Sequence, residues 1–364
     1  MTTMVLSRRA WLGLLAAVGT VGAGACLPAR ASSARTRLLA TWAEDGRYHA
    51  GVLQPGADAV QVQARIELPT RAHGLCQQAD GSVLVAARRP GDWLLHWHPD
   101  SGAAQWEWVN DDRRLNGHVM RSPDAKQLWT TETDQADASG LVGVRDPRSL
   151  ARLGEWRTHG MDPHAMLVLP QSVGDIPAGA LIVANGGIPT QSETGRSHRD
   201  LDRMDPSLVA LSPRDGRLLG QWRLDDARLS IRHLAFDAAT RRVGIALQAE
   251  HDDEAARSAA PILATWDGQR LQAADPAPGV KGYGGDIGAR PGGGFWVGAT
   301  RGDALVGWNA QGRVVARQAL PEACAVAVAG AHWWAGGGAT LLSDAGVQRM
   351  PVPAALDNHW LVLA

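Results

Sequence analysis

Short apolar runs alternate with turn-forming residues along most of the chain. Gly, Pro and Asp bound these runs, and no stretch keeps the period of an amphipathic helix. The pattern therefore predicts an all-β protein. The clearest predicted strands are residues 82–87, 93–97, 127–131, 141–144, 180–184, 208–211, 242–247, 261–266, 294–298, 304–308 and 332–335.

A longer unit repeats over this pattern. Each copy starts with a His, Asp or Cys, runs through apolar residues into a Pro/Asp/Gly turn, and continues as a second apolar strand. Successive copies are spaced by 45, 46, 69, 53 and 38 residues, close to the period of about 40–50 residues that is typical of propeller blades. The starting residues are His73, His118, His164, His233, Asp286 and Cys324.

The two chain ends supply a seventh unit. Residues 38–67 contain three strand-like pieces with no inner strand before them, while the chain finishes on His359 and the apolar run WLVLA. A C-terminal strand that joins the N-terminal three would close the ring and leave no sheet edge open. We therefore expect residues 32–364 to form a seven-bladed β-propeller, which fits the period better than a two-domain sandwich or a parallel solenoid.

Propeller geometry places the start of each inner strand and the end of the next strand on one face, around the central channel. The polar loop 188–207 leaves from the same face, so we expect it to form a lid or rim over the channel mouth. Candidate ligand-binding residues at this mouth are His73, Arg88, Glu132, Asn185, His198, Arg232, Asp286 and Arg301.

Histidines at comparable strand starts suggest a metal site. Neutral imidazoles with a carboxylate from Glu132 or Asp286 suit iron, copper or zinc, and a Cys324 thiolate would favour copper or zinc. His73 lies one residue out of register and would point away unless a bulge corrects it. The candidate metal ligands are His118, His164, His233 and His359.

Three other interpretations stay open. The histidines could be structural, because a Gly-His pair such as Gly117-His118 holds blade edges together in WD-type propellers. A propeller enzyme is the second: a lactonase-like hydrolase could use His164 or His233 as a base and Arg232 or Arg301 for an oxyanion, and a quinoprotein-like oxidoreductase is the other enzymatic alternative. No nucleophile-elbow, zincin, haem or phosphate-loop motif is present. A partner-binding scaffold is the third interpretation, suggested by 15 Trp beside two Phe and two Tyr.

The first 31 residues read as an export signal. Arg8-Arg9 precede an apolar run that is too short to span a bilayer, and Ala29-Arg30-Ala31 is a small-residue cleavage site. We expect a twin-arginine-exported, monomeric periplasmic protein without a stable membrane anchor, with lipidation at Cys26 left open. Removing Arg8, Arg9 and Arg30 leaves 33 basic and 37 acidic residues, a balance that does not favour nucleic acid.

Several stretches resemble a known family: ARRPGD, GHVMRSPD, TTETD, HGMDPHAML, VANGGIPTQSETGR, LDRMDPSL and LSIRHLAF. They look like domain-of-unknown-function family 1513 (DUF1513), exported bacterial propellers of the WD40/YVTN quinoprotein-like group. The resemblance spans nearly the whole mature chain. It implies an envelope protein of an iron- or metal-responsive locus, with imelysin-type and di-haem peroxidase-like proteins as possible partners and with no settled activity.

Overall fold

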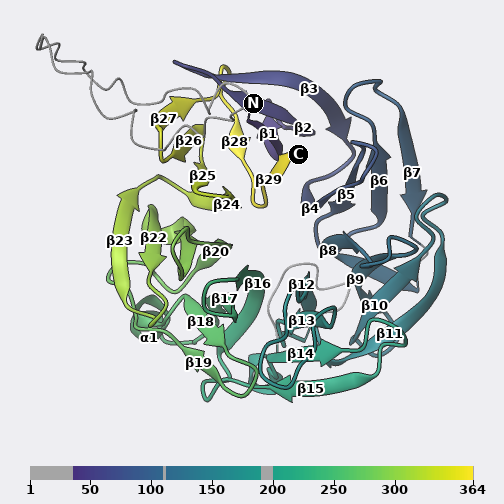
Figure 1. Ribbon diagram of the computed structural model, residues 1–364, viewed down its shortest axis with the longest axis vertical. Helices are drawn as coiled ribbons and strands as arrows, with labels where there is room; N and C mark the ends of the chain where they lie inside the picture. The colour runs from purple at the N-terminus through teal and green to yellow at the C-terminus, as the bar shows by residue number, and fades with distance from the viewer. Residues whose placement is uncertain (1–35, 110–111, 190–199, 364) are drawn as a thin grey trace, which may run out of the picture. The chain divides into compact units, whose positions relative to one another are not determined.

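The computed structural model describes residues 36–109, 112–189 and 200–363. In these ranges the chain folds into seven antiparallel sheets, arranged as blades around a common centre (Figure 1). The predicted seven-bladed β-propeller is confirmed. The predicted signal peptide and residues 190–199 of loop 188–207, with His198 among them, lie outside the described residues. None of the described helices is long and apolar enough to cross a membrane.

The first blade contains strands from both ends of the chain, and this closes the ring. β1 pairs with β2 on one side and with both C-terminal strands on the other, with Leu38 opposite Val362 and Trp42 opposite Leu356. The predicted closure by the C-terminal strand is therefore confirmed, and β28 and β29 lie beside β1 in Figure 1. The strands of this blade are β1 (Arg37–Glu44), β2 (Arg47–Pro55), β3 (Val60–Leu68), β28 (Ala355–Leu356) and β29 (Leu361–Leu363).

Each of the other six blades is a consecutive four-stranded meander. The second to fourth blades contain β4 (Ala72–Gln77), β5 (Val83–Ala87), β6 (Trp93–Trp97), β7 (Ala104–Trp108), β8 (Arg113–Arg121), β9 (Leu128–Asp134), β10 (Ser139–Arg145), β11 (Arg152–Met161), β12 (Pro163–Val168), β13 (Leu181–Asn185), β14 (Ser207–Leu211) and β15 (Leu218–Trp222).

The fifth to seventh blades contain β16 (Leu229–Asp237), β17 (Arg242–Ala249), β18 (Leu263–Trp266), β19 (Leu271–Ala273), β20 (Gly284–Ala289), β21 (Phe295–Ala299), β22 (Ala304–Trp308), β23 (Val314–Ala319), β24 (Ala323–Ala329), β25 (His332–Gly337), β26 (Thr340–Ser343) and β27 (Gly346–Arg349). The described helices are short and lie in connections: η3 (Leu201–Arg203), α1 (Glu254–Ala259) and η4 (Thr300–Gly302).

The apolar runs of the sequence correspond mainly to the second and third strands of the blades. Those strands are buried on both faces, as in β5 and β22, so their sequences read as continuous apolar runs. The inner strands begin earlier than the repeat suggested: β8 and β16 start before His118 and His233, which lie inside them.

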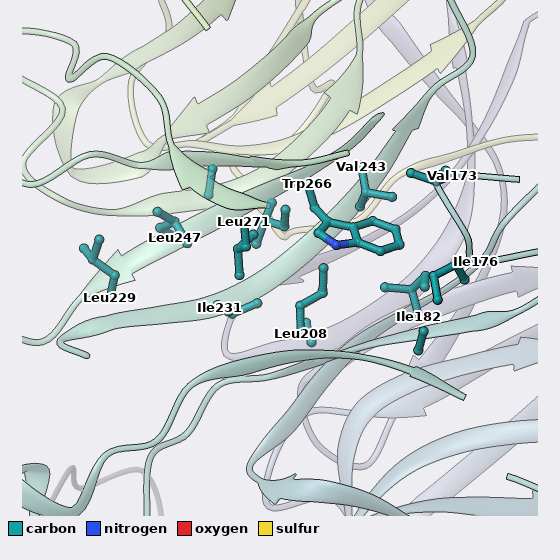
Figure 2. Packing of buried hydrophobic residues seen from close by; sticks show 14 of the residues in the cluster. Val173, Ile176, Ile182, Leu208, Leu229, Ile231, Val243, Leu247, Trp266 and Leu271 are labelled. Carbon is teal, nitrogen blue, oxygen red and sulfur yellow. The ribbon is translucent and has the colours of Figure 1, made fainter. Parts of the chain in front are cut away.

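Apolar side chains fill the space between neighbouring blades. Figure 2 shows one such layer, in which Trp266, Val243 and Ile231 of the fifth blade pack with Ile182 and Leu208 of the fourth. Burying one Trp removes about 200 Å² of apolar surface from water, or on the order of 5 kcal/mol. Five tryptophans at strand positions are buried in the core, namely Trp97, Trp129, Trp266, Trp296 and Trp308, whereas Trp108 in β7 is 55% exposed.

Candidate metal centre

The pairing of inner and second strands is interrupted at equivalent places in six blades. At each place the inner strand contains more residues than its partner between two paired positions, as between Ala72 and Leu75 and between Ile231 and Leu234. Such a bulge re-aims the side chains within it. The interruptions contain the six residues that start the repeat units: His73, His118, His164, His233, Asp286 and Cys324.

Five imidazoles from five consecutive blades meet in the central channel. The Nε2 atom of His164 lies 2.7 Å from Nε2 of His233 and 3.2 Å from Nε2 of His73, which lies 3.3 Å from Nε2 of His359. The His118 ring completes the group, with its centroid 4.9 Å from that of His73 and 4.8 Å from that of His359. We call these five residues the histidine cluster. The bulge at β4 brings His73 into it.

Glycines allow the inner strands to approach closely enough for these contacts. A Cβ atom on Gly74 would lie 2.4 Å from the carbonyl oxygen of Gly117, and one on Gly117 would lie 2.7 Å from Cδ2 of His73. Gly117 also has a φ of 106°, which L-residues rarely adopt. The Gly-His pair 117–118 therefore provides room for a neighbouring imidazole.

Asp286 orients one member of the cluster. Its Oδ1 lies 3.2 Å from Nδ1 of His359, and its two carboxylate oxygens also accept hydrogen bonds from the backbone N–H groups of Ile287 and Val326. A carboxylate on Nδ1 fixes the tautomer that leaves the Nε2 lone pair facing the cluster. Asp286 is thus positioned as an outer partner of His359.

Burial sets the protonation of four of the five cluster imidazoles. It lowers the pKa of each of four imidazoles well below its ordinary value, with a further contribution from neighbouring histidines and, at three of them, from Arg88 or Arg232. These imidazoles are neutral at pH 7, the form that binds metal ions. They are His73, His118, His164 and His233.

Protein hydrogen bonds do not account for the cluster. Within the described part of the chain, Nε2 of His118 and Nδ1 of His73, His164 and His233 are buried without a hydrogen-bond partner. Structural histidines are normally satisfied by backbone or carboxylate groups. A metal ion held by Nε2 atoms would give Nε2 of His118 a partner, and it would leave the three Nδ1 atoms as they are. The cluster, with four histidines whose ligand atoms lie within 4.8 Å of one another, could instead hold a metal ion.

A cavity of about 370 Å³ adjoins the cluster. Its lining includes three cluster imidazoles together with Arg88, Arg89, Arg232 and Arg301, and it contains one carboxylate residue, Glu250. The remaining lining residues are polar or aromatic: Asn116, Gln248, Tyr283 and Asn358.

Other predicted site residues lie elsewhere. Glu132 is buried in its own sheet, where Oε1 lies 2.7 Å from Nη2 of Arg145. Asn185 is also buried, and its Nδ2 donates to the Thr158 carbonyl. The Cys324 thiol lies 3.3 Å from the Leu356 carbonyl, outside the groups of described residues that could hold a metal ion, and burial raises its pKa.

The sequence reasoning missed Asp162. This fully buried carboxylate bonds to Arg89 and, at 2.8 Å, to Nη1 of Arg232. It therefore holds two of the cavity guanidinium groups in place. The sequence feature that could have identified Asp162 is its position two residues before His164, within the motif HGMDPHAML.

The fold and the cluster define a seven-bladed propeller with a histidine-lined channel. The chain belongs to the DUF1513 family, described as proteins of unknown function, which matches residues 66–363. No curated protein matches the chain.

Solved structures with similar folds have low sequence identity. Virginiamycin B lyase from Staphylococcus aureus is 12% identical, with a TM-score of 0.55 over 77% of this chain and 84% of the lyase. A chain of the mitotic checkpoint complex is 13% identical, with a TM-score of 0.54 over 78% of this chain and 80% of its own. At this identity the likeness concerns the fold alone.

Proposed function

We propose that this protein binds one divalent transition-metal ion in the histidine cluster. The observation that supports this most directly is the set of Nε2–Nε2 distances of 2.7, 3.2 and 3.3 Å. A metal ion with metal–nitrogen bonds of about 2.1 Å places neighbouring ligand nitrogens about 3.0–3.4 Å apart. Two of the three distances fall within this range and the third lies just below it.

Hydrogen bonding alone explains these contacts poorly. Nε2 of His73 contacts the rings of His164 and His359, and Nε2 of His164 contacts those of His73 and His233. A neutral Nε2 has either one proton or one lone pair. Nε2 of His73 and Nε2 of His164 would therefore each have to share that single proton or lone pair between two partners. One cation at the centre would satisfy all of these lone pairs together.

The donor set favours an ion that takes more than four nitrogen ligands. Imidazole suits iron, copper, nickel and zinc, while structural zinc sites are almost always four-coordinate. Five imidazoles without a thiolate are better matched to a five- or six-coordinate ion such as iron(II). Copper and zinc are the alternatives that metal analysis would distinguish.

Metal analysis of the protein purified from its own cell envelope tests the proposal. We expect about one equivalent of metal, and at least a hundredfold weaker binding after His164→Ala or His233→Ala, because each change removes a proposed ligand. His332→Ala is the matched control, since His332 is partly exposed and pairs with Asp344 outside the cluster. A metal-free native protein, or unchanged metal content in the cluster variants, would contradict the proposal.

We also propose that the protein is exported to the periplasm and has partner proteins there. The Arg8-Arg9 pair and the cleavage site before Ser32 support a periplasmic protein, and the family resemblance supports imelysin-type and di-haem peroxidase-like partners in an iron- or metal-responsive locus. Cell fractionation with Arg8→Lys plus Arg9→Lys tests export, which these changes should block. Co-purification under iron limitation tests the partners, and elution of the propeller alone would count against them.

A hydrolytic enzyme receives less support. His164 and His233 share the cavity with Arg232 and Arg301, as a base and oxyanion site would require. However, burial lowers the pKa of both imidazoles well below neutrality, and an effective general base has a pKa near the working pH. Lack of turnover across a panel of lactone and ester substrates would agree with this view.

A further inference from the structure

The cavity beside the histidine cluster has a strongly cationic wall. Four of its lining residues are arginines from three separate places in the chain: Arg88 and Arg89 follow β5, Arg232 lies in β16, and Arg301 lies in η4. Arg232 is only 2% exposed, and its Nε has no hydrogen-bond partner among the residues described.

The nearby carboxylates do not neutralise the positive charge of these arginines once a metal ion is bound. Asp162 pairs with Arg89 and Arg232, Glu250 lines the cavity, and Asp286 lies behind the cluster. Four guanidinium groups against three carboxylates leave one positive charge, and a divalent ion raises this excess to three. Uncompensated charge in a partly buried site is costly, so the charge balance calls for an anion from outside the protein.

We propose that the cavity binds a small di- or tricarboxylate between the metal ion and the arginines. One carboxylate would complete the coordination of the metal, and the others would accept hydrogen bonds from the guanidinium groups. This inference rests on the proposed metal site. The chemical class follows from the planar guanidinium fork, which matches a carboxylate in two parallel hydrogen bonds.

The arrangement of the arginines favours several anionic groups over one compact ion. The guanidinium groups come from three blades, the second, fifth and sixth, so we expect one phosphate-sized ion to reach only part of the wall. Arg301 lies at the mouth, with its guanidinium 4.5 Å from the centroid of the Tyr283 ring. A cavity of about 370 Å³ falls at the small end of the range for small-molecule sites, about 300–1,000 Å³.

Calorimetric titration of the full mature protein tests this inference. The probe is propane-1,2,3-tricarboxylate, which lacks the hydroxyl that makes citrate a strong chelator, and acetate and inorganic phosphate are titrated in parallel. Each protein is titrated with and without its metal, and metal content is measured afterwards. Arg301→Gln is the test variant, and Arg148→Gln, an exposed residue in the turn between β10 and β11, is the matched control.

We expect the tricarboxylate to bind the metal-loaded protein at least tenfold more tightly than acetate or phosphate. Arg301→Gln should weaken it about tenfold, as expected for the loss of one charge-assisted hydrogen bond, and Arg148→Gln should not. Metal-loaded protein that binds no tricarboxylate would overturn this inference and leave the metal site standing. Binding of equal strength without metal would overturn the bridging arrangement, and a chain that binds no metal would overturn the proposed function itself.

Discussion

Replacing Gly117 with Ala should weaken metal binding without altering any proposed ligand. The new Cβ would lie 2.7 Å from Cδ2 and 3.0 Å from Cβ of His73. Ordinary van der Waals contact begins at about 3.4 Å, so the His73 ring has to move by about 0.7 Å. Metal–ligand distances tolerate only about 0.2 Å. We therefore expect His73 to be lost as a ligand, and metal affinity to fall about 10- to 100-fold.

Backbone strain must be separated from this contact. At a φ of 106° a non-glycine residue costs about 1–3 kcal/mol, which lowers stability whatever the histidines do. Gly102→Ala is the matched control, because Gly102 has a φ of 75° and a Cβ there meets no atom within 4 Å. This variant should lose stability and keep wild-type metal affinity.

The assay is metal titration by calorimetry, combined with urea unfolding of the metal-free proteins. If Gly117→Ala bound metal as tightly as the wild type while both variants lost similar stability, His73 would not be a ligand. The argument from close strand packing would then fail. A Gly117→Ala protein that is as stable as Gly102→Ala and binds metal weakly would support it.

Three further predictions follow from the same contacts. In the metal-free protein the free energy of unfolding should fall as pH drops below about 6.5, because the unfolded chain takes up protons that the folded chain does not. The fall should reach up to about 1.4 kcal/mol per pH unit for each buried imidazole. Urea unfolding at pH 7.5, 6.5 and 5.5 measures this change, and a free energy of unfolding that does not vary with pH would contradict it. Asp286→Asn should weaken metal binding about tenfold by removing the carboxylate from His359, which competition titration measures, and unchanged affinity would refute the role of Asp286. Asp162→Asn should cost about 3–5 kcal/mol by leaving Arg89 and Arg232 unpaired, and a loss below about 1 kcal/mol in urea unfolding would show that this buried ion pair contributes little.

The fold was predictable because blade formation depends on local patterns that repeat. Apolar runs mark the buried second and third strands, and the spacing between repeat units counts the blades. The split first blade followed from its two incomplete ends, where residues 38–67 lacked an inner strand and the run after His359 could supply it. Such inferences need only sequence periodicity and the cost of an open sheet edge.

The details of the site were less accessible, because they depend on register and on contacts between blades. The bulge that turns His73 inward is a property of its pairing with β5, and no residue type marks it. Glu132 was predicted at the channel mouth. In the structure it lies within a sheet, opposite Leu141 of the neighbouring strand, and the Glu132 carboxylate pairs with Arg145 of that same strand. Asp162 contacts Arg89 and Arg232, which lie 73 and 70 residues away from it in the sequence. The sequence of its own blade therefore gave no indication of its role.

X-ray absorption spectroscopy at the metal edge tests the central claim most directly. For the protein purified with its native metal, we predict four or five nitrogen neighbours at about 2.0–2.2 Å, with the outer-shell scattering of imidazole rings. His164→Ala should lower the nitrogen count by one or abolish the signal. A first shell made only of oxygen, or a spectrum unchanged by this substitution, would show that the histidine cluster is not the metal site.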